Sequence, residues 1–245
     1  MMRAGAFDAV VDRLGSEIVS GAVPAGHVES VEAIVARTGV SRSIVREAVR
    51  VLVDAGLLSA RRRVGVRVQR ADAWDALDAR VIRWRLESPG RRAQLAELVE
   101  VRLAFEPAAA AAAAVRRTDA EASDLVDAAA ALAAEGEAGT AGGAGTAAVA
   151  GRVAAAGSGG AAERFFAADV RFHALLLAAS RNAMFVRLQS VVAEALRERS
   201  LGGHPHFPPS ARDVKLHRDI AEAVVGRRPE EAAELTRALI AGTAP

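Results

Sequence analysis

The 245-residue sequence contains no cysteine and no tyrosine, and aromatic residues make up only 4% of it. Without cysteine, neither disulfide bonds nor metal sites built from thiolates can form. Long hydrophobic runs are also missing: the apolar run Ala108–Val115 has eight residues, whereas a transmembrane helix needs about 20. The N-terminus shows no cleavable signal pattern. We therefore expect a cytoplasmic protein with no role at a membrane.

Neither sign of charge dominates the whole chain, whose formal net charge is +2, but basic residues are concentrated near its start. Residues 1–70 contain 11 Arg against 7 Asp and Glu, and residues 37–70 alone contain nine Arg against two acidic residues. A basic region on a nearly neutral chain indicates an anionic partner for that region alone.

The first 70 residues show the element order of a winged helix-turn-helix. Helices are predicted where apolar residues recur at helical spacing, and caps and glycines mark their ends. The predicted elements are a helix over residues 6–20, a short helix capped by Ser30 and ended by Gly39, a third helix from Ser41 to Ala55, and a hairpin of segments 57–62 and 64–69.

The third helix carries the strongest functional signal. Arg42, Arg46 and Arg50 are spaced by four residues and form one stripe, while apolar residues on the other side can pack inward. A recognition helix contacts base edges and phosphates, and arginine reaches O6 and N7 of guanine together. Such stripes are more often solvated faces, but the preceding helix, the glycine turn and the basic hairpin favour double-stranded DNA. The other residues expected at the DNA are Ser41, Ser43, Arg61, Arg62, Arg63 and Gly65.

This segment resembles the DNA-binding domain of GntR-family transcriptional regulators over nearly all of residues 7–69. The matching motifs are Gly21-x-x-Pro24-x-Gly26, Gly39-Val40-Ser41-Arg42, Val45-Arg46-Glu47-Ala48, Leu52, Gly56-Leu57-Leu58 and Gly65. The resemblance implies that Arg42 and Arg46 contact the operator, supported by Arg50 and the hairpin arginines. Glu32 departs from the pattern, because some members of the family place a DNA-contacting arginine there.

Beyond residue 70 the sequence pattern is helical only, so we expect a mainly α protein in which the winged helix-turn-helix precedes an all-α antiparallel helical bundle. The expected domains are a DNA-binding domain at residues 1–70, a linker helix at 71–90, and an effector-binding and dimerisation domain at 91–245. Predicted helices of the last domain lie at 91–116, after a capping box at Thr118 and Glu121, at 161–180 and 182–200, and after Ser210 and Pro229. The Gly- and Ala-rich segment 136–160 predicts a flexible insertion.

Three groups of polar residues in the helical part are candidates for binding a ligand. The motif Glu100-x-Arg102-x-x-x-Glu106 is expected on one face of the long helix. Asp169 and His173 lie one helical turn apart, and His217 lies on a later helix; these residue types suit a divalent cation. Each group also has a plain structural interpretation, as a salt bridge, a surface pair or a core histidine.

The order of these groups resembles the FCD effector domain of the FadR-like GntR subfamily over about residues 91–240. The resemblance implies a helical bundle around a cavity, where many members hold a metal with one Asp and three His beside a small organic acid. It assigns Asp169, His173 and His217 to a divalent metal of the zinc, nickel or manganese class. The residues that it assigns to a small carboxylate effector are Arg102, Glu106 and Asn182.

The fourth metal ligand of that family is missing. The family's last histidine would fall near Leu239, where this chain reads Arg237-Ala-Leu-Ile240. Three alternatives follow: three protein ligands plus water or effector, weak binding, or loss of the site. His204 and His206 could substitute only if their loop folds inward.

We therefore expect a homodimeric transcription factor, a repressor controlled by a metabolite, which binds a palindromic operator. The alternative is a metal-dependent hydrolase using Asp169, His173 and His217, but no general base stands out beside them. A protein that coats DNA without sequence preference is a third possibility, which the large helical domain disfavours. Sequence-specific DNA binding separates the regulator from the hydrolase.

Overall fold

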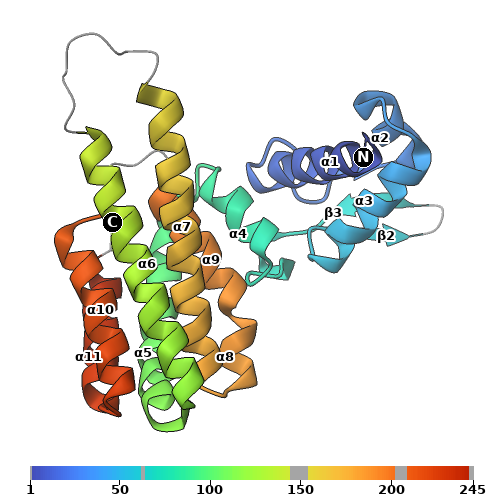
Figure 1. The fold of residues 1–245 in the computed structure, drawn as a ribbon. Helices are drawn as coiled ribbons and strands as arrows, with labels where there is room; N and C mark the ends of the chain where they lie inside the picture. The colour runs from blue at the N-terminus through green and yellow to red at the C-terminus, as the bar shows by residue number, and fades with distance from the viewer. Residues whose placement is uncertain (1, 62–63, 144–153, 202–208, 243–245) are drawn as a thin grey trace. The chain divides into compact units, whose positions relative to one another are not determined.

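The computed structural model describes residues 2–61, 64–143, 154–201 and 209–242. The chain divides into two compact units, Met1–Gln94 (unit 1) and Leu95–Pro245 (unit 2), and each is described by itself (Figure 1).

Unit 1 begins with the three predicted helices, which are α1 (Met2–Val19), α2 (Val31–Thr38) and α3 (Arg42–Asp54). The Ser30 hydroxyl accepts a hydrogen bond from the Ala33 N–H at 3.1 Å and starts α2. Gly39 ends α2 with a φ of 72°, a left-handed conformation that glycine adopts without strain. The Ser41 hydroxyl then caps α3. These residues fix the tight turn between α2 and α3, as the sequence predicts.

The predicted hairpin is present as β2 (Leu58–Arg61) and β3 (Gly65–Val68), with Ser59 opposite Arg67. A two-residue strand that the sequence did not predict, β1 (Val28–Glu29), pairs with the other edge of β3. The sheet is antiparallel with the order β1-β3-β2. The wing is therefore anchored to the segment between α1 and α2.

The single helix expected within residues 71–90 is replaced by the 3-10 turn η1 (Ala71–Ala73) and the helix α4 (Ala79–Leu86). The helix starts anew because the Asp78 carboxylate accepts hydrogen bonds from two backbone N–H groups of its first turn. The Trp84 ring is buried in the core of unit 1, and its Nε1 donates to Asp12 Oδ1 at 3.3 Å. Helix α4 is thus part of the packed DNA-binding unit and not a free linker.

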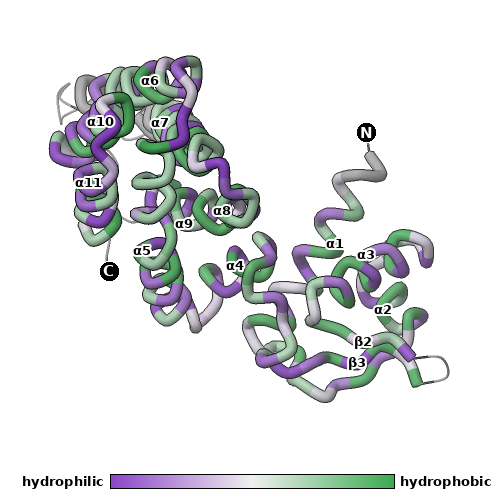
Figure 2. Tube along the Cα trace, turned by 90° about the horizontal axis from the view of Figure 1, so that it is seen from below, coloured by the Kyte–Doolittle hydropathy of each residue, from purple (hydrophilic) through white to green (hydrophobic). Residues whose placement is uncertain are grey.

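The described residues of unit 2 form helices and the turns between them (Figure 1). Its helices are α5 (Arg91–Arg116), α6 (Asp119–Gly143), α7 (Ala154–Ala179), α8 (Ala183–Arg187), α9 (Gln189–Leu201), α10 (Ala211–Val225) and α11 (Pro229–Ala241). Hydrophobic stretches alternate with hydrophilic ones along these helices, so each can bury one side (Figure 2). The main core joins residues of α5, α6, α7, α10 and α11, and many of them are alanines that let helices approach closely. No helix in the described part of the chain is long and apolar enough to cross a bilayer.

Two predictions for unit 2 are corrected. The segment 136–160 is not an insertion throughout, because α6 continues to Gly143 and α7 already begins at Ala154. The two segments contain seven glycines and five alanines, so helix propensity does not explain them. They extend α6 and α7, which pack against each other. The helix expected at 182–200 is two helices that meet at Leu188. The residues between α6 and α7, and His204 and His206, lie outside the described residues.

Candidate functional site

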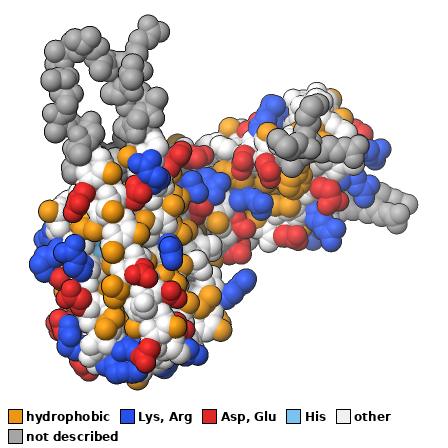
Figure 3. Space-filling model, viewed as in Figure 1, with side chains coloured by type: hydrophobic (Ala, Val, Ile, Leu, Met, Phe, Trp, Pro, Cys, Tyr) orange, Lys and Arg blue, Asp and Glu red, His pale blue; other side chains and the backbone are white. Residues whose placement is uncertain are grey.

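Helix α3 presents the arginine stripe to solvent. Arg42, Arg46 and Arg50 are exposed, while Val45 and Leu52 on the other side are fully buried. On the face of unit 1 seen in Figure 3, blue side chains, which in this unit are arginines only, lie over the part where Figure 1 draws α3 and the hairpin. An exposed, cationic face beginning at the N-terminus of a rigid helix can contact DNA phosphates and base edges.

The other predicted DNA residues have mixed roles. Arg61 is exposed at the end of β2, and Arg62 and Arg63 lie outside the described residues. The Ser41 hydroxyl caps α3 and lies 3.0 Å from the Ser43 hydroxyl. Gly65 has a φ of 104°, and a Cβ placed there would lie 2.8 Å from the Glu29 carbonyl oxygen. The close approach that Gly65 permits is therefore to strand β1, a structural role that the sequence did not predict.

Glu32 contacts the recognition helix directly. Its Oε1 lies 2.8 Å from Nη2 of Arg42, and both side chains are well exposed. A pair this exposed contributes little to stability. It does place the carboxylate that departs from the GntR pattern against the first arginine of the stripe.

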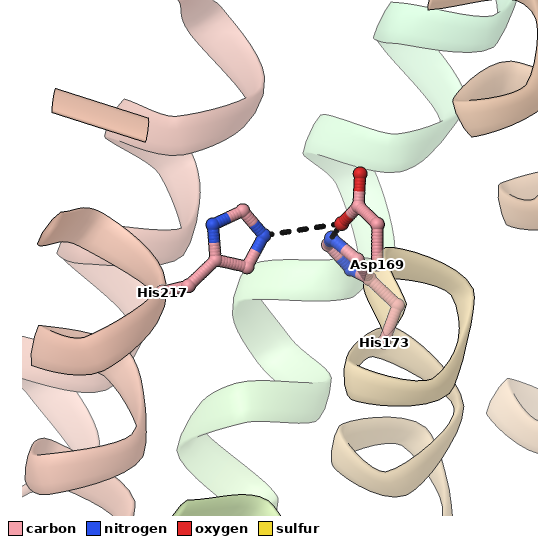
Figure 4. A group of neighbouring side chains, drawn as sticks. All are labelled: Asp169, His173 and His217. Atoms are coloured by element: carbon pink, nitrogen blue, oxygen red, sulfur yellow. Dashed lines mark hydrogen bonds and ion pairs between the residues drawn. The ribbon is translucent and has the colours of Figure 1, made fainter. Parts of the chain in front are cut away.

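The second site is a buried cluster of polar residues inside unit 2. Asp169 and His173 extend from α7, and His217 reaches toward them from α10 (Figure 4). All three are buried, and one ligand atom from each lies within 4.8 Å of the others. Phe172 packs edge-on against both imidazoles, with ring centroids 5.7 and 4.9 Å away. The apolar ring fixes the orientation of the two histidines.

His217 is held at both ring nitrogens. Its Nδ1 lies 2.7 Å from the carbonyl oxygen of Asp213, which is only an acceptor, so Nδ1 carries a proton. Its Nε2 lies 3.2 Å from Asp169 Oδ1. A proton on Nε2, or a cation between Nε2 and Oδ1, would satisfy this contact. A backbone carbonyl at the other nitrogen is the usual outer partner of a metal-binding histidine.

His173 stands between two carboxylates. Its Nδ1 lies 2.8 Å from Glu106 Oε2 on α5, and its Nε2 lies 3.5 Å from Asp169 Oδ1. The other oxygen of Glu106 accepts a hydrogen bond of 2.5 Å from Nε of Arg102. The Arg102–Glu106 salt bridge is thus present, and it is also joined to the candidate metal ligands through His173.

The electrostatics of the cluster keep both carboxylates ionised. Burial alone would raise the pKa of Glu106, but the charge of Arg102 and the contact with His173 lower it to about 2. Burial likewise opposes ionisation of Asp169, yet His217, His173 and Arg199 lower its pKa well below the usual value. Two ionised carboxylates in an apolar core require cationic partners.

Several polar atoms of the cluster are buried without a hydrogen bond. They are Nη2 of Arg102, Oε2 of Glu106, Oδ2 of Asp169 and both ring nitrogens of His173. The contacts of His173 with the two carboxylates are close but are not aligned as hydrogen bonds. Buried polar groups in native proteins are nearly always paired, with protein, water or ligand. The unpaired nitrogen and carboxylate donors fit a divalent cation, and the free Arg102 edge fits an anionic oxygen.

The remaining predicted residues lie elsewhere. Glu100 is exposed and does not share the face of Arg102 and Glu106, because two residues turn a helix by about 200°. Leu239 is buried in the apolar core and offers no ligand atom.

Asn182 is not brought together with Arg102. Its Oδ1 accepts from the Met184 N–H at 3.0 Å and caps α8. The last residue of α5, Arg116, donates to the Ser180 carbonyl oxygen at 3.0 Å. Arg102 lies fourteen residues earlier in the same helix, about 21 Å along its axis. The expected effector contact of Asn182 beside Arg102 therefore has no support in this geometry.

The order of a winged helix-turn-helix and a helical unit has counterparts among known proteins. Residues 7–68 match the family of bacterial regulatory proteins called the gntR family, and residues 97–242 match the FCD domain. The chain belongs to the GntR family. It is a DNA-binding transcriptional regulator of the GntR/FCD type, as the sequence motifs predict.

Individual GntR relatives agree with this assignment. The galactonate operon transcriptional repressor of Escherichia coli K12 is 26% identical over 231 residues, which cover 92% of this chain and 91% of the relative. A solved structure of Lar, which controls the expression of the Listeria monocytogenes agr system and mediates virulence, has a TM-score of 0.59 at 20% identity. It covers 97% of this chain and 94% of that chain. The E. coli protein McbR/YncC has a TM-score of 0.50 at 17% identity, with coverages of 97% and 94%. Both structures show the fold.

The family assignment excludes the hydrolase alternative, because GntR proteins are regulators and not enzymes. One charged residue beside the cluster was not predicted from the sequence. Arg199 on α9 lies close enough to Asp169 to lower the pKa of that carboxyl. Arg199 lies in a run of charged residues at the end of a helix, so the spacing of apolar residues in the sequence does not indicate that it is buried.

Proposed function

We propose that this GntR regulator binds a palindromic operator as a homodimer and that a small carboxylate metabolite bound in the FCD domain controls this binding. The observation that carries the proposal is the convergence of His173 and His217 on Asp169, next to a buried Arg102 edge without a hydrogen bond. Closed point-group dimers present two recognition helices to two symmetric half-sites.

In the proposed site, Asp169, His173 and His217 hold a divalent cation of the zinc, nickel or manganese class. A bound cation supplies positive charge and an open coordination position for a ligand oxygen. Arg102 binds the carboxylate through its free Nη2, and Glu106 holds both Arg102 and His173 in place. Leu239 supplies no fourth ligand, so the cation is bound less tightly than by four protein ligands.

We propose that the chain is a repressor and that its ligand is a sugar acid or a similar organic acid. The support is the E. coli relative, which is named as the repressor of a galactonate operon and spans nearly the whole chain. We also propose that the protein is located in the cytoplasm, because the operator DNA that it is proposed to bind is there.

The test begins with an operator selected from random duplexes by the wild-type protein. The affinity of that duplex is then measured by fluorescence anisotropy, at fixed salt, with the protein stripped of metal or reloaded with zinc, nickel or manganese. Galactonate is the first ligand titrated. We expect a ligand-dependent change in affinity of about tenfold or more that requires the metal. Equal affinity under every combination of metal and ligand would refute the proposal.

A further inference from the structure

Arg199, near the end of α9, is a buried cation that the proposed metal and effector contacts do not use. Its side chain is 8% exposed, and neither Nη1 nor Nη2 makes a hydrogen bond within the described part of the chain. The guanidinium has an ion pair with Asp213, whose Oδ2 lies 3.3 Å from Nη2. That Asp213 oxygen already accepts from the Ser210 backbone and hydroxyl, which form the capping box of α10.

A short chain of contacts joins Arg199 to the proposed effector site. Asp213, its ion-pair partner, accepts through its carbonyl oxygen from Nδ1 of His217, and Nε2 of His217 faces Asp169. Leu196, one turn before Arg199 on α9, packs with Phe105 of α5 and Leu177 of α7. Helix α9 therefore lies against the helices that carry Arg102, Glu106 and Asp169.

We propose that Arg199 is a second ligand-anchoring residue of this site and that the site selects hydroxy acids, with Arg102 binding the carboxylate and Arg199 a hydroxyl oxygen. This inference rests on the proposed function. Two guanidinium groups on different helices, α5 and α9, each carry unpaired buried N–H groups. A ligand with two separated acceptor groups satisfies both, whereas a simple carboxylate leaves one arginine unpaired.

The charges in the cluster indicate that the second acceptor is neutral. Arg102 and Arg199 are cationic, and Glu106, Asp169 and Asp213 are acidic. These five groups sum to one negative charge, and a divalent cation makes the sum one positive charge, which one carboxylate neutralises. A second carboxylate would leave an uncompensated negative charge in an apolar core. A hydroxyl accepts from Arg199 without adding charge.

The test compares matched acids on the full-length protein loaded with zinc. Galactonate and gluconate are measured against hexanoate, and glycolate against acetate, by isothermal titration calorimetry. Galactarate tests a second carboxylate. We expect wild type to bind at least one hydroxy acid about tenfold or more tightly than its unhydroxylated match, because a buried donor left unpaired rejects the analogue without the hydroxyl.

Arg199→Gln should reduce this preference to within about threefold while affinity for the unhydroxylated acid stays unchanged. Arg199→Lys, which keeps the charge but not the planar fork, should give an intermediate preference. Arg187→Gln is the matched control, because Arg187 lies on the preceding helix α8 with an exposed side chain, and it should behave as wild type. Operator binding without ligand shows that each variant is folded.

The outcomes separate this inference from the proposed function. If Arg102→Ala removes binding of all acids while Arg199→Gln keeps the full hydroxy-acid preference, Arg199 is structural and the inference is wrong although the proposed function stands. Tighter binding of galactarate than of galactonate overturns the single-charge argument. If wild type binds none of these acids, or if Arg102→Ala binds all of them as wild type does, the proposed function fails and the inference fails with it.

Discussion

The imidazole of His217 on α10 lies 3.2 Å from the carboxylate of Asp169 on α7, and a backbone carbonyl holds its other nitrogen at 2.7 Å. The two residues are 48 positions apart in the sequence. Packing of the two helices thus creates a ligand set that neither helix has alone, and the first prediction concerns its metal.

Metal retention should follow the number of ligands. After dialysis against a mild chelator, we expect Leu239→His to retain the most zinc, wild type less, and His173→Ala the least, as measured by plasma mass spectrometry. Because Leu239 is buried in the apolar core, the variant should be less stable than wild type without metal and regain stability when zinc is added. Leu235→His, one turn earlier against the same core, is the control and should gain no zinc. Equal, negligible metal in all four proteins would mean that this chain does not use the site.

Arg46 lies in the middle of the exposed stripe on α3. Arg46→Ala should weaken binding of the selected operator by about 1–3 kcal/mol, through loss of a base or phosphate contact. The melting temperature should change little, because the side chain is exposed. Arg13→Ala, on α1, is a control that should leave affinity nearly unchanged. Wild-type operator affinity in folded Arg46→Ala protein would show that another face of unit 1 reads the DNA.

Gly15 of α1 lies directly beneath the Trp84 ring, and an added Cβ would come within 2.4 Å of its atoms. Gly15→Ala should therefore destabilise unit 1 by about 1–3 kcal/mol, although alanine favours helices. Gly5→Ala is the matched control on the same helix, where a Cβ meets nothing within 4 Å. It should leave stability unchanged or slightly raised in urea unfolding followed by circular dichroism. Similar effects of both substitutions would contradict the docking of α4 on α1.

Glu17 connects α1 with α2 through Arg37, at 2.6 Å, and Arg37 in turn contacts Glu29 of β1 at 3.0 Å. Partial burial would raise the pKa of Glu17, but hydrogen bonds from Arg13 and Arg37 outweigh it and lower the pKa below 4.5. Because the folded pKa is depressed, the stabilisation is present above about pH 4.5 and is lost as the pH falls through the folded value.

At neutral pH, Glu17→Gln should cost about 1–2 kcal/mol of unfolding free energy, and the difference from wild type should shrink toward pH 3. The exposed Glu47→Gln on α3 is the control. Urea unfolding at pH 7, 5 and 3 measures this, and a difference that is constant over the range would contradict the ion-pair explanation.

Much of the fold follows from local signals in the sequence. Ser30, Gly39 and Ser41 mark the helix-turn-helix because caps and a left-handed glycine act within a few residues. Strand β1 was not predicted, because two residues carry no periodicity and become a strand only by pairing with β3. The break before α4 was missed because the apolar spacing of residues 71–88 continues through the Asp78 cap.

The candidate site was predicted only in part, because local signals do not reveal contacts between distant segments. Spacing places Asp169 and His173 on one face, but the approach of His217 and Glu106 depends on tertiary packing and was expected only from the family resemblance. Arg199 was missed because its burial comes from neighbouring helices. Asn182 was assigned from chain order alone. That order does not show that Asn182 caps α8, near the end of α5 opposite to Arg102.

Arg102 tests the central claim that the buried cluster controls DNA binding. Its side chain is 3% exposed, its Nε holds Glu106, and its Nη2 is unpaired. The measurement is the affinity of the selected operator for zinc-loaded Arg102→Ala, with Arg102→Gln as a less disruptive second variant, over a titration of the acid that shifts wild type. We predict that operator affinity without the acid stays within about threefold of wild type and that the response to the acid is lost, because a buried charge-assisted contact has been removed. A folded variant that still responds at the wild-type acid concentration would contradict the account.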